Sequence, residues 1–235
     1  MKTTSTPTDK EIQTLFNSIA PIYDQMNDWL SFGVHRIWKK MAVNWTDVQP
    51  HFIGLDLCCG TGDLTFLLAN KISQGKIIGV DFSPQLLAVA QEKQKLKPKI
   101  NNIEWIESDV LSLPFTDNFF DCATMGYGLR NVVDIPACLQ EIKRVLKPHR
   151  KVAILDFHHP SDSFLANAQK WYLDNIVVNV AKYFQSTAQY AYLNPSLERF
   201  PNGQEQIKLA LDVGFSHAIH YPLGGGIMGV LVLTK

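Results

Sequence analysis

A short stretch with two glycines and two acids carries the strongest chemical signal of the sequence. Residues 55–63 read Leu-Asp-Leu-Cys-Cys-Gly-Thr-Gly-Asp, an apolar run that leads through a turn into a helical pattern. Gly60 and Gly62 allow the backbone to turn tightly and to approach a ligand, because no Cβ stands in the way. The free N–H groups at the start of the following helix suit an anion such as a carboxylate. The stretch therefore predicts a small-molecule site between a strand and a helix.

Acidic residues after the next two predicted strands narrow the ligand class. Asp81 ends the second strand, where a carboxylate accepts charge-assisted hydrogen bonds from two ribose hydroxyls, a feature that NAD enzymes share. Asp109 follows the third strand, and an acid next to a backbone N–H, here that of Val110, suits an adenine amino group and ring nitrogen. The sequence has no third glycine to complete the G-x-G-x-x-G pattern of dinucleotide sites, and Pro114-Phe115 precedes the fourth strand.

The pattern D-x-x-x-G-x-G, followed by Asp81 and Asp109, resembles the class I methyltransferases. The resemblance implies S-adenosylmethionine (SAM) as the cofactor. The implied cofactor contacts are Asp56, Gly60, Thr61, Gly62, Asp81, Phe82, Asp109, Val110 and Gly126. The alternative is that Asp56 and Asp63 only cap or orient the turn and that Asp109 is an ordinary loop acid.

The hydrophobic pattern must place these residues on one sheet. Short apolar runs alternate with helical patterns, which indicates parallel strands joined by crossover helices. The predicted strands are 52–57, 76–81, 103–107, 119–125, 151–157, 216–221 and 226–234, and the predicted helices are 62–71, 84–95, 135–146 and 203–213. Ser83 and Pro84 predict a helix start, and Pro148 ends the third helix. The glycine turn at 224–226 makes the last two strands antiparallel to each other. We therefore predict an α/β, Rossmann-like fold with a seven-stranded, mostly parallel sheet and one antiparallel strand.

The chain length predicts a single domain over residues 1–235. Its expected parts are N-terminal helices at 9–47, a cofactor-binding core at 52–157, a helical cap insertion at 160–200, and a C-terminal helix and strands at 203–235. Ile12, Leu15, Phe16 and Ile19 repeat with helical spacing in the first part.

Composition excludes several function classes. The 22 basic and 22 acidic side chains cancel, so no global field favours nucleic acid, and the basic run at 93–99 is expected to be a solvated helix face. Four cysteines without C-x-x-C spacing suggest neither a disulfide framework nor a metal site. The apolar runs fall short of the ~18 residues that a membrane span needs, and the N-terminus lacks a signal-peptide pattern. We expect a cytoplasmic protein.

Further stretches resemble the ubiquinone/menaquinone-biosynthesis C-methyltransferase family over nearly the whole chain. They are residues 23–27, 30–38, 55–63, 113–115, 128–132, 144–148, 192–193 and 199–201. The chain departs from the family at Pro148-His149-Arg150, where Pro-Gly-Gly is common, and at His158-His159, where a hydroxyl residue is usual. The ending at 224–229 is more similar to cyanobacterial and plastid members, which methylate 2-phytyl-1,4-naphthoquinol. The alternatives are demethylmenaquinol, a ubiquinone precursor, or a SAM-binding module without catalysis.

The resemblance also implies acceptor-site residues. Arg130, Asn131 and Tyr23 are expected at the quinol oxygens, where a guanidinium stabilises developing phenolate charge. The alternatives are an ion pair of Arg130 with Asp134 or Asp24, and a packing role for Tyr23.

Three histidines are weaker candidates for a general base, namely His35, His158 and His159. The adjacent pair is not expected to bind a metal, because neighbouring strand residues point to opposite faces. The aromatic-rich cap is expected to pack on the core, to line a channel for the isoprenoid tail, or to touch the bilayer that holds the lipophilic quinol.

Overall fold

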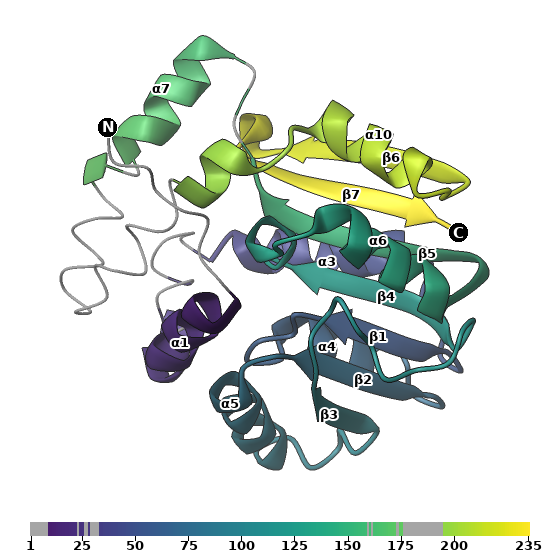
Figure 1. Cartoon of the computed structure of the whole chain (residues 1–235). Coiled ribbons are helices and arrows are strands. Elements are labelled where there is room, and N and C mark those ends of the chain that lie inside the picture. Colours follow the sequence, from purple (N-terminus) through teal and green to yellow (C-terminus); the bar gives the residue numbers. More distant parts are fainter. Residues whose placement is uncertain are drawn as a thin grey trace.

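A computed structural model describes residues 9–22, 24–25, 28, 33–158, 160, 162–172, 174–175 and 195–235. These residues form a seven-stranded sheet with helices on both faces (Figure 1). Tyr23 and His159, two residues singled out in the sequence, lie outside this part of the chain, as do 176–194 of the predicted cap.

The sheet has the strand order β3-β2-β1-β4-β5-β7-β6. Its strands are β1 (Ile53–Leu57), β2 (Lys76–Asp81), β3 (Ile103–Glu107), β4 (Phe120–Gly126), β5 (Leu146–Phe157), β6 (His217–Leu223) and β7 (Met228–Thr234). β7 runs antiparallel to both of its neighbours, whereas the pairs from β3 through β5 are parallel. The prediction of a mostly parallel sheet with one antiparallel strand is therefore confirmed.

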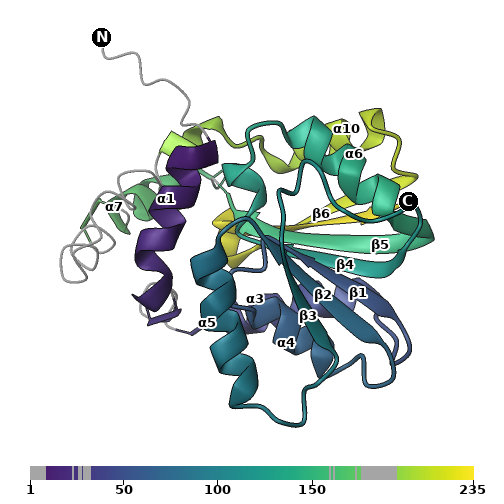
Figure 2. The same ribbon diagram turned by 60° about the horizontal axis from the view of Figure 1, so that its bottom comes forward.

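The helices precede and connect these strands. They are α1 (Asp9–Ile19), η1 (Ala20–Ile22), α3 (His35–Trp45), α4 (Asp63–Ala69), α5 (Pro84–Lys95), η2 (Leu129–Asn131), α6 (Ile135–Val145), α7 (Ser163–Tyr172), α10 (Gly203–Asp212) and η4 (Gly224–Gly226). Residues 195–199 are also helical. α3, α4 and α5 lie on one face of the sheet, and α6 and α10 lie on the other (Figure 2).

Apolar side chains fill the space between these layers. The largest buried cluster joins β1, β4 and β5 to α6 and α10 through residues such as Leu55, Ile142 and Ala210. On the opposite face, Val43 of α3 and Leu68 of α4 pack against the sheet in a second cluster. Because both faces are covered, the central strands are mostly apolar and buried, as expected for parallel strands in an α/β fold.

Local sequence explains where the connecting helices begin. The Ser83 hydroxyl accepts a hydrogen bond from the backbone N–H of Leu86, and Pro84 occupies the first turn of α5, which confirms the predicted start. Asn202 and Glu205 form a reciprocal capping box at α10. These caps fix the first residues of α5 and α10.

The predicted start of the fifth strand is wrong by five residues, whereas the other strand bounds differ by at most two. The fifth strand begins at Leu146 rather than at 151, so Pro148 lies within β5 and not in a connecting loop. The first residues of β5 pair with β4 only through Leu146, and the register shifts before Lys151 pairs. His149 has a φ of 62° at this irregularity. The irregular stretch between Leu146 and Lys151 is a place in a strand where a proline is tolerated, because the regular pairing with β4 is interrupted there.

Candidate active site

A cleft opens at the carboxyl edge of the parallel strands, with about 700 Å³ of empty space that is continuous with solvent. It is the position at which open α/β sheets bind ligands. Seven residues singled out in the sequence line it: Gly60, Asp81, Phe82, Asp109, Val110, Gly126 and Asn131. Asp56, Thr61 and Gly62, which were grouped with them, are described by the structure but are not among the lining residues.

The glycine-rich turn adopts backbone angles that favour glycine. Gly60 has a φ of 55° and Gly62 a φ of 90°, and Cys58 adopts a φ of 50° despite its side chain. The Trp105 ring lies behind the turn, because a Cβ on Gly62 would stand 2.6 Å from its Cη2 atom. Trp105 is held by a hydrogen bond from its Nε1 to Gln94 at 2.6 Å. The turn therefore lies on a rigid aromatic support.

Asp81 connects the turn to the start of α5. Its carboxylate accepts hydrogen bonds from the backbone N–H groups of Gly60 at 2.8 Å and Ser83 at 2.9 Å. Burial raises the pKa of this carboxyl to about 6, although the backbone hydrogen bonds act in the opposite direction. Asp81 thus holds the turn and faces the cleft at the same time.

Asp56 lies beneath the turn and is fully buried. It accepts hydrogen bonds from the hydroxyls of Thr65 on α4 at 2.6 Å and Thr124 on β4 at 2.8 Å. Burial raises its pKa to about 7, while the two hydroxyls lower it. Asp56 therefore joins three elements below the cleft, which is the orienting role that the sequence left open for it.

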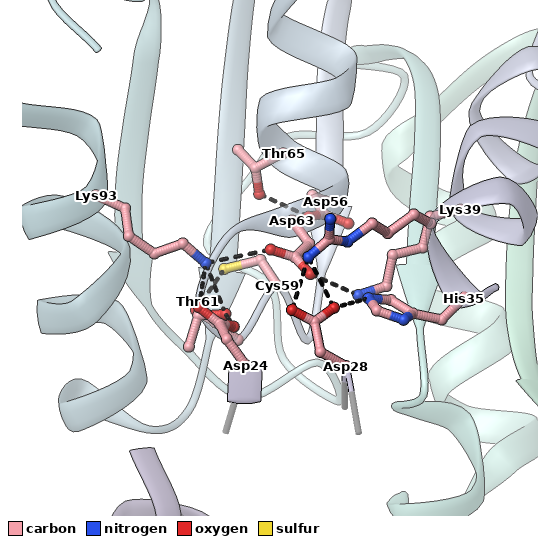
Figure 3. A network of polar contacts seen from close by, with 12 residues as sticks. Asp24, Asp28, His35, Lys39, Asp56, Cys59, Thr61, Asp63, Thr65 and Lys93 are labelled. Carbon is pink, nitrogen blue, oxygen red and sulfur yellow. Dashed lines mark hydrogen bonds and ion pairs between the residues drawn. The ribbon is translucent and has the colours of Figure 1, made fainter. Parts of the chain in front are cut away.

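A polar network surrounds the other side of the turn (Figure 3). Lys93 of α5 donates to Asp24 at 2.7 Å, to Asp63 at 3.1 Å and to the hydroxyl of Thr61 at 3.2 Å. The Thr61 hydroxyl in turn donates to Asp24 at 2.5 Å, and the buried Lys39 donates to Asp63 at 2.7 Å. The network ties the N-terminal residues to the turn.

Asp63 forms ion pairs with both lysines of the network, Lys39 and Lys93. Burial raises the pKa of this carboxyl, but the ion pairs with Lys39 and Lys93 outweigh it and hold the pKa well below its usual range. Lys93 was expected to be solvated with the rest of the basic run. That expectation is wrong for this residue, since only a quarter of its side chain is exposed.

A second cavity adjoins the cleft and contains about 840 Å³ of empty space open to solvent. It lies between the segment after β4 and the segment before α10. Its walls include Arg130, Asp134, Pro136, Arg199, Phe200, Pro201 and Leu209. Ile12, Asn131, Val132 and Val133 line both spaces. A molecule in the second cavity would therefore lie against a molecule in the cleft.

Arg130 is anchored at the wall of the second cavity. Its Nη1 donates to the carboxylate of Asp156 at 2.5 Å and to the carbonyl of Tyr127 at 2.8 Å. Its guanidinium carbon lies 5.2 Å from the ring centre of Phe157. The ion-pair partner is thus Asp156, not Asp134 or Asp24, the partners weighed in the sequence.

A model of the ubiE/COQ5 methyltransferase family matches residues 4–235. The chain belongs to this family. It is 54% identical to the 2-phytyl-1,4-naphtoquinone methyltransferase of Trichormus variabilis, over 96% of this chain and 99% of that protein. It is 56% identical to the enzyme of the same name from Nostoc punctiforme, over 96% and 98%. The chloroplastic 2-phytyl-1,4-beta-naphthoquinone methyltransferase of Arabidopsis thaliana is 50% identical, over 96% and 87%.

Solved structures support the fold of this family member. A SAM-dependent methyltransferase from Aquifex aeolicus gives a TM-score of 0.63 at 18% identity, with 83% of this chain and 88% of that chain covered. A putative S-adenosyl-L-methionine-dependent methyltransferase from Methanococcus maripaludis gives 0.64 at 18% identity, with 100% and 97% covered. The class I, Rossmann-like methyltransferase fold is confirmed, and the protein is a SAM-dependent methyltransferase.

The cleft of this ubiE/COQ5 family member has a chemistry that fits SAM. Two carboxylates, Asp81 and Asp109, are acceptors for hydroxyl and amino groups, and Val80, Leu86 and Leu111 provide apolar surface for a flat ring. The glycine-rich turn ends at the start of α4, a type of position that suits an anionic group.

Two of the histidines considered as general bases in this methyltransferase are buried and do not line either cavity. His35 is buried on α3 near Asp28, and burial lowers its pKa. His158 is buried against His220, with 3.0 Å between their Nε2 atoms. Neither of these described histidines is among the residues that line the two cavities. Their positions fit a structural role.

The sequence did not assign several cleft residues of this family member. Ile12 and Phe16 of α1 line the cleft together with Ser108, Tyr127 and Gly128. The helical spacing of Ile12 and Phe16 predicted a buried helix face, but that spacing does not reveal which surface the face covers. Ser108 precedes Asp109, and Tyr127 follows Gly126, so proximity to the predicted contacts is the signal that marks these two.

Proposed function

We propose that this protein methylates a ring carbon of 2-phytyl-1,4-naphthoquinol, the reduced form of its quinone substrate. The observation that carries the proposal is the second cavity beside the cleft, whose lining includes Arg130 and Asn131. The names of the relatives with 50–56% identity support a naphthoquinol as the acceptor.

The proposed cofactor contacts follow from the cleft. Asp81 accepts hydrogen bonds from the ribose hydroxyls, and Asp109 with the backbone N–H of Val110 receives the adenine edge. Phe82 and Gly126 border the nucleoside, and the turn at 60–62 receives the amino-acid end. Asp56 acts on this site from below through Thr65 and Thr124.

Bound in this cleft, SAM supplies a methyl group on a positively charged sulfur. A deprotonated quinol hydroxyl pushes electron density onto the neighbouring ring carbon, whereas the oxidised quinone cannot do so. Arg130 stabilises the phenolate charge, and Asn131 and Tyr23 complete the contacts to the quinol oxygens. The ring fills the second cavity and displaces water from it, and the cavity walls hold the ring carbon in line with the methyl group.

Product analysis tests this function. The protein is incubated with SAM and dithionite-reduced 2-phytyl-1,4-naphthoquinone, and mass spectrometry follows addition of one CH₂ unit. Parallel reactions contain the oxidised quinone, a demethylmenaquinol and a ubiquinone precursor. The proposal expects a product from the reduced phytyl naphthoquinone and none from its oxidised form. Preferential methylation of a benzoquinol would overturn the acceptor, and no turnover of any quinol would favour a non-catalytic SAM-binding module.

We further propose that the protein meets its lipophilic substrate at a bilayer surface through α7. Within the described part of the chain, no helix has both the length and the apolar character to cross a membrane. On α7, however, Phe164 is 76% exposed and Trp171 is 61% exposed, and they are seven positions apart on the same helix face. Exposed aromatic residues on an amphipathic helix insert into the interface between headgroups and acyl chains.

Vesicle binding tests the membrane proposal. A protein with Phe164→Ser and Trp171→Ser is compared with the unchanged protein in co-sedimentation with phospholipid vesicles that contain the quinol. The paired substitution is expected to weaken sedimentation, whereas Leu96→Ser, at an 83% exposed site beyond α5, leaves it unchanged. Equal sedimentation of all three proteins would remove α7 as the contact.

A further inference from the structure

We propose that Asp156 is the positioning residue that fixes the Arg130 guanidinium for reaction. The inference rests on the proposed role of Arg130 at the quinol oxygen. Asp156 itself lines neither cavity among the described residues, so its effect on the reaction passes through Arg130.

The Asp156 carboxylate is fully engaged at the end of β5. One oxygen accepts from Arg130 Nη1 at 2.5 Å and from the backbone N–H of Phe157 at 2.8 Å. The other accepts from the backbone N–H of Arg130 at 3.1 Å. Asp156 therefore holds both the main chain and the side chain of Arg130. With a side chain only 2% exposed, it has little freedom to reorient.

Three contacts restrict the guanidinium, two at Nη1 and one with an aromatic ring. The Asp156 carboxylate and the Tyr127 carbonyl both accept hydrogen bonds from Nη1, and the guanidinium carbon lies over the Phe157 ring. A planar group held at one end and along one side has a defined direction for its remaining N–H bonds. The geometry thus sets the direction of the Arg130 Nε–H bond.

Two buried polar atoms remain without a hydrogen-bond partner among the described residues: Arg130 Nε and Asn131 Oδ1. Asn131 Nδ2 donates to the Tyr127 carbonyl at 3.0 Å, which turns Oδ1 away from that carbonyl. Buried polar groups are normally paired, so a donor and an acceptor left open on consecutive residues of a cavity wall indicate a ligand with a complementary group. A phenol oxygen offers both an acceptor and a donor.

A purely stabilising ion pair would not need this arrangement. Asp121, at the start of β4, is the matched case: it is also buried, accepts a backbone N–H from Ile53 at 3.0 Å, and pairs with Lys147 at 2.8 Å. It lines neither cavity. Asp121→Asn therefore controls for the loss of a buried carboxylate as such.

A double-mutant cycle on turnover tests the proposal. The set comprises Asp156→Asn, Arg130→Ala, the double variant and Asp121→Asn, assayed with saturating SAM and the quinol that the unchanged protein methylates. Asp156→Asn is expected to lower kcat about 100-fold, the loss that follows from a misplaced catalytic group. In the Arg130→Ala background it is expected to lower kcat no further than about twofold. The Kd for SAM and the kcat of Asp121→Asn are expected to stay unchanged.

A spectroscopic readout works without any substrate. In the free protein labelled with ¹⁵N, the buried Arg130 Nε–H is expected to give a slowly exchanging side-chain signal, assigned by its loss in Arg130→Ala. Asp156→Asn is expected to shift or broaden this signal, whereas Asp121→Asn leaves it in place. Because this measurement needs no turnover, it separates failure of the positioning role from failure of the proposed acceptor chemistry.

Several outcomes would overturn the inference. They are a normal kcat in Asp156→Asn, the same fractional loss of kcat in both backgrounds, or an unchanged Arg130 signal. If Asp156→Asn does not fold, Asp156→Glu keeps the charge and displaces the carboxylate by one methylene. The same loss of kcat with an unchanged Kd for SAM is then expected, and a normal kcat would contradict the role.

Discussion

The Trp105 ring on β3 occupies the space that a side chain on Gly62 would need. A Cβ there would stand 2.6 Å from Trp105 Cη2 and 3.1 Å from Phe66 Cε2. The hydrogen bond from the indole to Gln94 at 2.6 Å orients the ring in this position. A glycine is therefore needed at position 62 for two reasons. Its φ of 90° is in the left-handed region, and the Trp105 ring leaves no space for a Cβ.

Gly62→Ala is expected to lower the free energy of unfolding by about 2–5 kcal/mol, the sum of left-handed backbone strain and overpacking. Gly33→Ala is the matched control, because Gly33 has a φ of 75° and no atom of the described residues lies within 4 Å of the added Cβ. It is expected to lose only about 1–2 kcal/mol from strain. Urea unfolding measures both, and equal losses would contradict the role of Trp105.

Asp81→Asn is expected to raise the Kd for SAM about 10- to 150-fold, because hydrogen bonds to a charged acceptor contribute about 1.5–3 kcal/mol. Isothermal titration calorimetry measures the change. Glu107→Gln serves as the control, since Glu107 ends the neighbouring β3, is exposed and does not line the cleft. Unchanged SAM affinity in Asp81→Asn would remove this residue from the cofactor site.

Arg130→Ala is expected to lower kcat by about 100-fold or more at saturating SAM while leaving the Kd for SAM unchanged. Arg130→Lys should be nearly as impaired, because an ammonium cannot bind Asp156 and also offer the separate Nε–H donor. Arg36→Ala changes an exposed arginine paired with Asp28, outside both cavities, and should keep normal turnover. Weakened cofactor binding in Arg130→Ala would show that the residue belongs to the cleft instead.

The buried Asp56 predicts an unusual dependence of stability on pH. Burial raises its pKa from 3.8 to about 7 in the folded protein, so the folded state binds the proton more tightly than the unfolded state. The contribution of Asp56 to folding stability is therefore fully present below pH 3.8 and is lost as the pH rises through 7. The prediction concerns the difference in the free energy of unfolding between the unchanged protein and Asp56→Asn. This difference should fall by up to about 4 kcal/mol as the pH rises from 3.8 to about 7.

Asp121 gives the opposite sign and serves as the control. Burial raises the pKa of Asp121, but the hydrogen bond from the Ile53 N–H and the ion pair with Lys147 together lower it by more. The pKa of Asp121 therefore lies below its usual value. Its contribution is present at neutral pH and is lost as pH falls through the acidic range. Denaturant titrations at a series of pH values measure both differences. A difference for Asp56→Asn that rises with pH would contradict the assignment.

Local patterns were sufficient to predict most of the sheet. β2 and β3 have the predicted bounds, and the Ser83-Pro84 cap marks the start of α5, because alternating apolar segments and caps are properties of a few adjacent residues. The strand after Val145 was placed too late, since a proline with polar neighbours is typical of a loop. Only the pairing of Leu146 with Phe120 shows that the strand has already begun.

The candidate site was only partly predictable for a related reason. Residues at strand ends, such as Asp81 and Asp109, are found by their place in the pattern. The partner of Arg130 depends instead on β4 and β5 lying side by side, which brings together residues 26 positions apart. Lys93, in the basic run at 93–99, likewise pairs with Asp24, which is 69 positions away. Such pairs follow from strand order and helix placement, not from spacing.

β7 comes after every other strand in the chain, yet it lies inside the sheet between β5 and β6. β6 therefore has no strand to pair with until β7 arrives, and the β5 edge stays open until the same moment. During synthesis on the ribosome, the Rossmann-like half can assemble while the remainder of the sheet waits for residues 228–234. A ribosome that stalls before these residues would thus leave a nascent chain with an unpaired, aggregation-prone strand edge, a state that chaperones would have to shield.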